Sequence, residues 1–445
     1  MKHASPALAA VLFLTLATAA QASPPKPLPN PDRPAVTPIL RSSAADASSS
    51  STATISAGQA CASMRRLARR GNGAVSIRVM NLKSRKNVCA LNSAARRSLA
   101  SNTKLFTTAS ALARFGRSHT FRTRVFAAGP VKNGTLDGNL YLKGGGDPSF
   151  GTGAFLDSYL AGVGTEVEKL AIQVRRAGIK RVTGRVFADD TIFDRLRGVA
   201  DSGYATSPWI GPLSGLSFNA GYTSSSLSQF SSDPARLAAR TLARSLRVRG
   251  VNVRLETGVR RTPKRALKNL IARQISPDMT WMARLTNLNS VNFWAETLLK
   301  GLGAKYLKSG TTANGVKVVR RTMATLDVDV WPIDGSGLTF GNRSTAHDVV
   351  KLLYKARSEP WGRSFFLSLP TAGVDGTLAD RMRGSAAQRR CHAKTGTLTG
   401  VTALSGYCYN ASGRQFAFSI LMNDVYNLDR ARAAQDRIAA LVARL

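Results

Sequence analysis

Alternating apolar and polar positions predict a β-hairpin near the start of the folded chain. Residues 74–79 alternate between the two kinds of side chain, which is typical of a half-buried strand, and residues 87–91 follow as the expected partner. A helix is predicted just before this hairpin, over 59–69, and Gly71 is expected to end it. A second helix, apolar along most of its length, is predicted over 103–115. The sequence therefore indicates a mixed α and β fold.

The pattern changes between residues 122 and 268, where short strands alternate with Gly-rich turns. Helices are predicted to interrupt these strands over 166–177 and 234–248. We interpret 122–268 as an inserted α+β domain. It would divide one larger domain into the segments 59–121 and 269–445.

Helical patterning returns after the insertion. Helices are predicted over 280–284 and 293–300, and the chain is expected to end in a helix over 429–445. Either Asp429 or Asn427 would cap this last helix, because both side chains can accept a hydrogen bond from its first backbone N–H groups.

The first residues have the composition of a secretory signal peptide, predicted over 1–22. Positive charge at 1–3 precedes an apolar run over 7–19 and a small-residue cleavage site at 20–22. Residues 23–58 are rich in Pro, Ser, Ala and Thr, so a disordered leader is expected there. No later stretch approaches the roughly 18 apolar residues of a membrane span, so no transmembrane anchor is predicted and the mature protein is expected to be secreted and periplasmic.

The chain is strongly basic. It holds 63 Lys and Arg against 25 Asp and Glu, a formal charge of +38, which attracts polyanions. Export argues against nucleic acid, so anionic wall polymers and lipid head groups are the partners that this charge favours. Arginine clusters at 65–66, 69–70 and 260–265 are candidate contacts, although such runs commonly form only a solvated face.

Four cysteines in an exported chain favour two disulfides. Cys391 and Cys408 flank a predicted hairpin with its turn at 399–400, and counting outward from that turn pairs one with the other. Cys61 and Cys89 would form the second bridge by elimination. None of the spacings resembles a zinc site, and no metal is expected.

Three short motifs point to nucleophilic serine chemistry. In chain order they are Ser101-Asn102-Thr103-Lys104, Ser290-Val291-Asn292 and Lys394-Thr395-Gly396. Ser101 starts a predicted helix, so Lys104 lies on the same helix face with its amine near the hydroxyl. Lys104 can accept the Ser101 proton only if burial or a second cation lowers its pKa, and Lys394 is a candidate for that cation.

The third motif lies in a strand-like segment, 392–398. Alternation places Lys394 and Gly396 on one side of this strand and Thr395 and Thr397 on the other. Gly396 would let a substrate backbone approach closely. The chain has no Gly-x-Ser-x-Gly motif, which disfavours a Ser-His-Asp hydrolase.

Together these motifs resemble those of the low-molecular-weight class C penicillin-binding proteins, the D-alanyl-D-alanine carboxypeptidase/endopeptidases. Further stretches similar to this family are 140–150 (LYLKGGGDPSF), 289–300 (NSVNFWAETLLK), 334–338 (DGSGL) and 369–378 (LPTAGVDGTL). The resemblance implies an α+β fold: a transpeptidase/β-lactamase-like domain with an antiparallel sheet between helices, split by an insertion between the first two motifs. The gap from Lys104 to Ser290 is shorter than in members with two inserted domains, so a single or trimmed insertion is expected.

The resemblance also assigns chemical roles. Ser101 would be the nucleophile, Lys104 its base, and Ser290 a relay that passes the proton towards the leaving amine. The backbone N–H groups of Ser101 and Thr397 would form the oxyanion hole.

The remaining motif residues would bind substrate. Asn292 would hold the amide of the substrate, while Lys394 and Thr395 would grip its C-terminal carboxylate beside Gly396. Val291 replaces an acidic residue that is common in the family, but only the two ends of this motif carry chemistry.

The implied activity is cleavage of D-Ala-D-X bonds in peptidoglycan stem peptides through a serine acyl-enzyme, without a cofactor. It is carboxypeptidase action where X is D-alanine and endopeptidase action where X is a cross-linking diamino acid, and β-lactams would inhibit both. One alternative is a β-lactamase, disfavoured because no Glu-x-x-Leu-Asn is present to activate a deacylating water. Another is a non-catalytic wall-binding scaffold, which the intact motifs disfavour.

Overall fold

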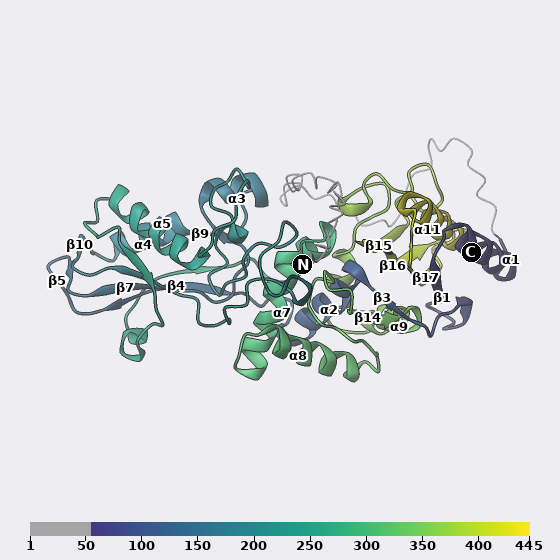
Figure 1. The fold of residues 1–445 in the computed structure, drawn as a ribbon, viewed down its shortest axis with the longest axis horizontal. Coiled ribbons are helices and arrows are strands. Elements are labelled where there is room, and N and C mark those ends of the chain that lie inside the picture. The colour runs from purple at the N-terminus through teal and green to yellow at the C-terminus, as the bar shows by residue number, and fades with distance from the viewer. Residues whose placement is uncertain (1–54) are drawn as a thin grey trace, which may run out of the picture.

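The computed structural model describes residues 55–445, which form an elongated molecule of two modules (Figure 1). The main module contains both ends of the described chain, and the insertion lies at the opposite end of the molecule. The predicted signal peptide, and the predicted leader up to residue 54, lie outside the described residues. Among the helices of the described part, none is long and apolar enough to span a membrane.

One antiparallel sheet organises the main module. Its order is β15-β16-β17-β1-β2, so the first strand of the chain pairs with the last. The strands are β1 (Ala74–Asn81), β2 (Asn87–Leu91), β15 (Cys391–Leu398), β16 (Val401–Tyr409) and β17 (Gln415–Asn423). Ile77 of β1 faces Ile420 of β17 in this register. The two distant parts of the chain therefore close a single sheet.

Helices cover both faces of this sheet, as the resemblance implies. Helices α1 (Ala57–Arg70) and α11 (Leu428–Val442) bury Met64 and Ile438 against one face. The larger core on the other face includes Phe106 and Trp294. Its helices are α2 (Thr103–Phe115), α6 (Met279–Leu288), α7 (Asn292–Leu307), α8 (Thr312–Thr325), α9 (Ala346–Ala356) and α10 (Gly362–Leu367), and a small pair of strands, β3 (Arg96–Ser98) and β14 (Arg343–Thr345), lies beside them.

The helix ends follow the capping chemistry of the sequence. Helix α1 begins at Ala57, two residues before the predicted start, because Ser56 and Gln59 form a reciprocal capping box. Residues 57 and 58, assigned to the disordered leader, are therefore helical. Asn427 rather than Asp429 caps α11, accepting a hydrogen bond from the N–H of Arg430.

The insertion is built on a mixed sheet of order β12-β11-β7-β4-β13. Its strands are β4 (Arg122–Ala128), β7 (Asn139–Lys143), β11 (Val186–Asp189), β12 (Thr257–Val259) and β13 (Leu270–Ile275). Helices α4 (Val167–Arg176) and α5 (Pro234–Val248) bury Leu170 and Leu242 in its core. Smaller elements are β5 (Val131–Lys132), β6 (Thr135–Leu136), β8 (Phe150–Gly151), α3 (Gly153–Leu160), β9 (Thr165–Glu166) and β10 (Arg181–Val182). Because β13 pairs with β4, the insertion extends to Ile275, and the predicted boundary at 268 is wrong.

Both predicted disulfides are present. Cys391 and Cys408 occupy facing positions of β15 and β16, on either side of the predicted turn at 399–400. Cys61 and Cys89 join α1 to β2. The bridges therefore tie the main sheet to a covering helix and join two of its strands to each other.

Candidate active site

Ser101 lies in a tight turn that leads directly into α2. Residues Ala100–Asn102 form one turn of 3₁₀-helix, and Ala100 adopts a φ of 45°. A left-handed conformation costs a non-glycine residue about 1–2 kcal/mol, and such strain clusters at functional sites. Gly337 packs so closely here that a Cβ at its position would lie 1.8 Å from the Ala100 carbonyl oxygen. The surrounding chain thus holds the Ser101 turn in a conformation that it would not adopt alone.

Lys104 is completely buried one turn further along α2. Its Nζ lies 2.9 Å from Ser101 Oγ, 2.7 Å from Asn292 Oδ1 and 2.6 Å from the Ser336 carbonyl oxygen. All three partners are neutral oxygens. Burial lowers the pKa of Lys104 to about 7, although the nearby carboxyl groups of Asp334 and Glu296 act to raise it.

Helix α7 begins at the last residue of the second motif and carries polar side chains along one face. Asn292, Glu296 and Lys300 follow at intervals of four residues, which places them on one side of the helix. Ser290, just before the helix, has a φ of 57°. Within the described residues its hydroxyl has no hydrogen-bond partner. Ser290 therefore lies at the N-terminal end of α7 without a hydrogen bond to Ser101 or Lys104.

Strand β15 places the third motif beside the Ser101 turn. Lys394 is fully buried, and its Nζ donates to the Thr395 carbonyl oxygen at 2.9 Å. Burial lowers the pKa of Lys394, and the charge of Lys104 lowers it further. The buried Asn102 donates from Nδ2 to the Lys394 carbonyl oxygen at 3.1 Å, which joins the start of α2 to β15.

Gly396 packs closely against the Ser101 segment. A Cβ at this position would lie 2.8 Å from the Leu99 carbonyl oxygen and 3.1 Å from the backbone nitrogen of Ser101. In this structure, glycine therefore permits the close approach of the Ser101 segment, and the approach of a substrate backbone stays a prediction.

The two threonines of β15 point to different neighbours. Thr395 is half-buried and its Oγ1 donates to Oγ1 of Thr377 at 2.8 Å. Thr397 is exposed, and its hydroxyl accepts from Arg432 of α11 at 3.1 Å. Sequence reasoning assigned no role to Thr377, although it lies within the stretch 369–378 that carried part of the resemblance.

A residue from the insertion also reaches this site. Asn292 Nδ2 donates to the Trp209 carbonyl oxygen at 2.9 Å. Trp209 is 57% exposed and belongs to a tight turn closed by two backbone hydrogen bonds between Ser207 and Ile210. Sequence reasoning missed Trp209, because nothing local indicates that this turn lies beside Asn292.

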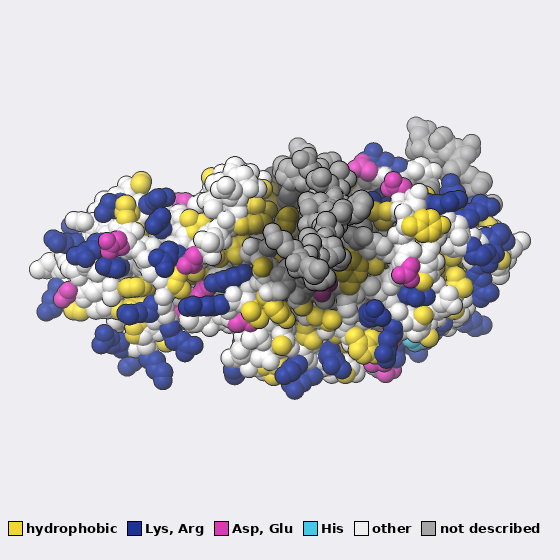
Figure 2. Space-filling model, viewed as in Figure 1, with side chains coloured by type: hydrophobic (Ala, Val, Ile, Leu, Met, Phe, Trp, Pro, Cys, Tyr) yellow, Lys and Arg dark blue, Asp and Glu magenta, His cyan; other side chains and the backbone are white. Residues whose placement is uncertain are grey.

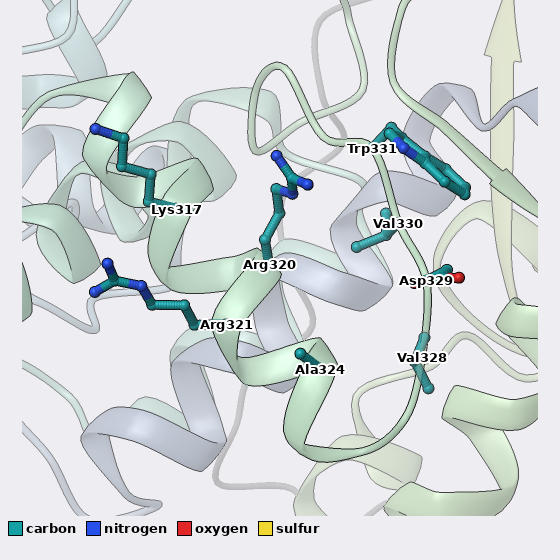
Figure 3. Close-up of a pocket in the computed structure, with 8 residues that line it drawn as sticks. All are labelled: Lys317, Arg320, Arg321, Ala324, Val328, Asp329, Val330 and Trp331. Atoms are coloured by element: carbon teal, nitrogen blue, oxygen red, sulfur yellow. The ribbon is translucent and has the colours of Figure 1, made fainter.

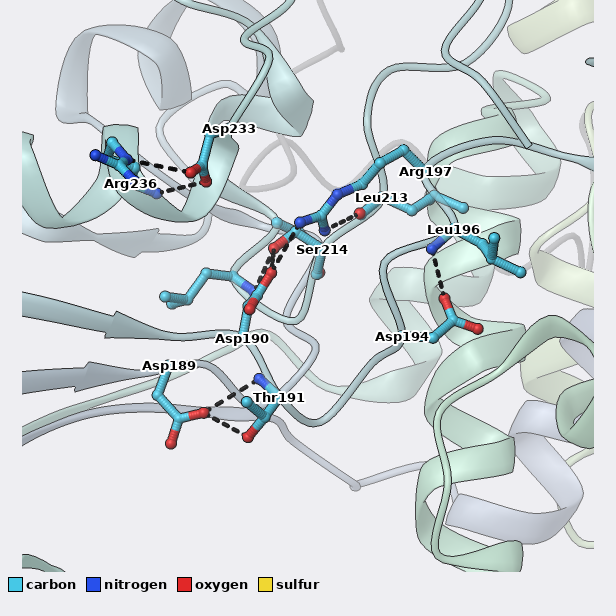
Figure 4. A network of polar contacts seen from close by, with 12 residues as sticks. Asp189, Asp190, Thr191, Asp194, Leu196, Arg197, Leu213, Ser214, Asp233 and Arg236 are labelled. Carbon is cyan, nitrogen blue, oxygen red and sulfur yellow. Dashed lines mark hydrogen bonds and ion pairs between the residues drawn. The ribbon is translucent and has the colours of Figure 1, made fainter. Parts of the chain in front are cut away.

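Polar contacts hold the segment that carries this turn, residues 190–214, which we call the strap. Arg197 binds the Asp190 carboxylate at 3.2 Å and donates to the Leu213 carbonyl oxygen at 2.6 Å, closing the strap on itself (Figure 4). Asp194 forms an ion pair with the buried Lys300 of α7. The strap is therefore fixed to the same helix that carries Asn292.

The site places a serine hydroxyl beside a lysine amine. Among the described residues, no group of three or more His, Cys, Asp or Glu side chains is placed to hold a metal ion. The structure brings Ser101, Lys104 and Asn292 into direct contact, and it packs the strand of Lys394 against the Ser101 turn.

Comparison with known proteins identifies relatives over most of the chain. A family model described as "D-Ala-D-Ala carboxypeptidase 3 (S13) family" matches residues 64–233 and 217–445. The D-alanyl-D-alanine carboxypeptidase of Actinomadura sp. (strain R39) is 31% identical over 429 residues, covering 77% of this chain and 76% of the relative.

Among solved structures, penicillin binding protein 4 from Haemophilus influenzae superimposes with a TM-score of 0.71 at 19% identity, covering 84% of this chain and 97% of the other. The same protein in complex with a β-lactam gives a TM-score of 0.69 at 19% identity and the same coverage of both chains. These likenesses confirm the predicted fold class.

Proposed function

Because this chain belongs to the D-Ala-D-Ala carboxypeptidase 3 (S13) family, we propose that it is a periplasmic enzyme that cleaves D-Ala-D-X bonds of peptidoglycan peptides through an acyl-enzyme on Ser101. The resemblance drawn from the motifs is confirmed at the level of the family, and with it the prediction of a D-Ala-D-Ala carboxypeptidase. The nucleophile, the steps of the reaction and the location are the proposal.

The arrangement of hydrogen bonds around Lys104 carries this proposal. A neutral lysine amine has two N–H donors and one lone pair. Asn292 Oδ1 and the Ser336 carbonyl oxygen can only accept, so they take both donors. The lone pair is then left for the third neighbour, the Ser101 hydroxyl. The lowered pKa of Lys104 makes this neutral form accessible near pH 7.

The proposed reaction combines this geometry with the roles that the resemblance implies. Ser101 Oγ attacks the carbonyl carbon of D-alanine while its proton passes to the Lys104 amine. The N–H groups of Ser101 and Thr397 hold the oxyanion, and the C–N bond breaks as the leaving amine takes a proton from Lys104 by way of Ser290. Water then attacks the ester carbonyl and loses a proton to Lys104. The bond between the acyl carbon and Ser101 Oγ breaks, and Lys104 returns that proton to Oγ as the acid product leaves.

Substrate binding uses the donors that remain. One hydrogen of Asn292 Nδ2 is engaged by the Trp209 carbonyl, so the other is left for a carbonyl of the substrate peptide. Lys394 and Thr395 bind the terminal carboxylate of the substrate. Lys394 is buried, and the oxygen to which it donates belongs to a neutral carbonyl. The carboxylate of the substrate would therefore give its side chain an oppositely charged partner.

The decisive experiment is the intact mass of the mature protein after mixing with penicillin, beside Ser101→Ala. A stable one-to-one adduct on the wild type, absent from the variant, is expected. Rapid penicillin hydrolysis without an adduct would instead favour a β-lactamase. If the folded protein shows no adduct and no hydrolysis, the non-catalytic scaffold is favoured.

The two peptidase activities are separated by their substrates. Release of D-alanine from a stem pentapeptide measures carboxypeptidase action, and cleavage of a cross-linked dimer measures endopeptidase action. We expect both activities to disappear in Ser101→Ala, because they share one nucleophile.

We further propose that anionic wall polymers bind the arginine-rich end of the main module. Lysine and arginine are dense on the surface there (Figure 2), and residues 55–121 include no acidic side chain. Arg65, Arg66 and Arg69 line a groove of about 450 Å³ on α1, and Arg66 also lines a second groove of about 360 Å³ between α1 and α11. Away from that end, Lys317, Arg320 and Arg321 of α8 line another basic groove of about 440 Å³, opposite Trp331 (Figures 1 and 3).

Binding of this kind is screened by salt. We expect the protein to co-sediment with a phosphodiester wall polymer at low ionic strength and to be released as salt is raised. Replacing the four arginines of α1 by glutamine should weaken this association without changing acylation by penicillin. Equal binding by wild type and variant would exclude the α1 face as the contact.

A further inference from the structure

Two buried carboxyl groups, those of Glu296 and Asp334, lie near Lys104 and belong to none of the three motifs. Glu296 is fully buried on α7, one helical turn after Asn292. Its Oε1 accepts hydrogen bonds from two consecutive backbone N–H groups, those of Gly335 at 2.9 Å and Ser336 at 2.7 Å. Asp334 is also buried and accepts from the N–H groups of Gly337 at 2.7 Å and Thr339 at 2.8 Å. The two carboxyl groups therefore hold consecutive parts of one loop.

The same loop contacts the amine of Lys104. The carbonyl of Ser336 accepts from Lys104 Nζ at 2.6 Å, while the N–H of Ser336 is held by Glu296. Helix α7 thus reaches Lys104 by two routes. Asn292 contacts the amine directly, and Glu296 contacts it through the backbone of Ser336.

The second carboxyl oxygen of Glu296 differs from the first. Oε2 is buried and has no hydrogen-bond partner within the described residues. Burial, together with the nearby charge of Asp334, raises the pKa of Glu296, which favours the neutral acid. The other charged groups that interact with it are Lys104 and Lys300. We therefore expect that an uncharged oxygen acceptor at position 296 is enough to bind the N–H groups of Gly335 and Ser336.

We propose that Glu296 is a positioning residue, which fixes the Ser336 carbonyl against the Lys104 amine and so directs the lone pair of that amine to Ser101. This inference rests on the proposed role of Lys104 as the base. Glu296 acts through the backbone of residues 335–336 and contacts neither Ser101 nor Lys104 itself.

A pair of substitutions of similar size tests this role. Glu296→Gln keeps an amide oxygen that can accept both N–H groups, whereas Glu296→Met fills the space without an oxygen acceptor. Acylation by penicillin is measured over a range of concentrations, which separates the binding constant from the rate of the acylation step. We expect the glutamine variant to match the wild type and the methionine variant to lose about 100-fold in the acylation step with unchanged binding.

Two further variants keep the test decisive. Glu296→Asp retains the carboxyl group but shortens its reach, so it should also slow the acylation step, and it serves where the methionine variant does not fold. Thr297→Val is the matched control, because Thr297 is equally buried on α7 but bonds only the Phe293 carbonyl oxygen. We expect this control to acylate normally.

The outcomes distinguish this inference from the proposed function. If folded methionine and aspartate variants acylate as fast as the wild type, or if the glutamine variant is as slow as the methionine variant, the positioning role is wrong. If the wild type itself forms no adduct, the proposed function fails before Glu296 is tested.

Discussion

The surroundings of two buried lysines, Lys104 and Lys300, show how similar burial serves different purposes. Both side chains are fully buried, and burial lowers the pKa of each. Lys300 is bonded to the Asp194 carboxylate, which opposes that decrease, whereas Lys104 contacts only neutral oxygens. The chemistry of the bonded partner therefore helps to decide whether a buried lysine stays charged or becomes neutral.

Replacing Lys104 should have the largest effect on this comparison. Lys104→Met keeps Ser101 but removes the group that accepts its proton, so the acylation rate with penicillin should fall by about 10³-fold or more. The measurement is the rate of adduct formation by intact mass, with thermal unfolding followed to verify that the variant is folded. A folded Lys104→Met protein that acylates normally would show that another group is the base.

The pH dependence of acylation should follow Lys104. Because its pKa is lowered to about 7, the neutral amine predominates above that pH and is lost below it. Acylation should therefore fall by about tenfold for each pH unit below 7, and be about 100-fold slower at pH 5 than on the plateau. A flat profile from pH 5 to pH 8 would contradict a lysine base.

Lys300→Met should change stability rather than chemistry. The substitution leaves the Asp194 carboxylate without its cation, and Asp194 is partly exposed, so we expect the free energy of unfolding to fall by about 2–3 kcal/mol. Denaturant unfolding measures this loss. Acylation by penicillin should change only slightly, and a loss as large as that of Lys104→Met would remove the distinction between the two lysines.

The smallest expected effect is that of Trp209→Ala. The substitution keeps the backbone carbonyl that accepts from Asn292 but removes an exposed indole beside the site. We expect KM for a stem peptide to rise by no more than about tenfold, with penicillin acylation nearly unchanged. Trp209→Phe should restore part of the loss, whereas equal KM values for all three proteins would exclude contact between the indole and the substrate.

Local sequence patterns predicted the elements whose signals lie in neighbouring residues. Helix α2 has the predicted bounds, 103–115, because an apolar run ends at a glycine that stops it. The hairpin of β15 and β16 is aligned by its turn, which is why counting outward from 399–400 paired Cys391 with Cys408 correctly. These features need no knowledge of the rest of the fold.

Features that depend on contacts between distant segments could not be predicted in this way. Strand β13 belongs to the insertion only because it pairs with β4, far earlier in the chain. Trp209 reaches Asn292 because the strap is fixed to α7 through Asp194, and neither contact has a local signal. Lys394 was a candidate for lowering the pKa of Lys104, but burial is the main cause, and burial is a property of the assembled core.

The polar face of α7 has a mechanical consequence. Asn292 and Lys300 are eight residues apart on one continuous helix, a distance of about 12 Å along its axis. Asn292 touches the amine of Lys104, and Lys300 is anchored to the insertion through Asp194. Because a helix is stiff along its axis, a force on the insertion that shifted α7 by a fraction of an ångström would also move Asn292 relative to the Lys104 amine. Helix α7 thus connects the insertion mechanically to the amine of Lys104.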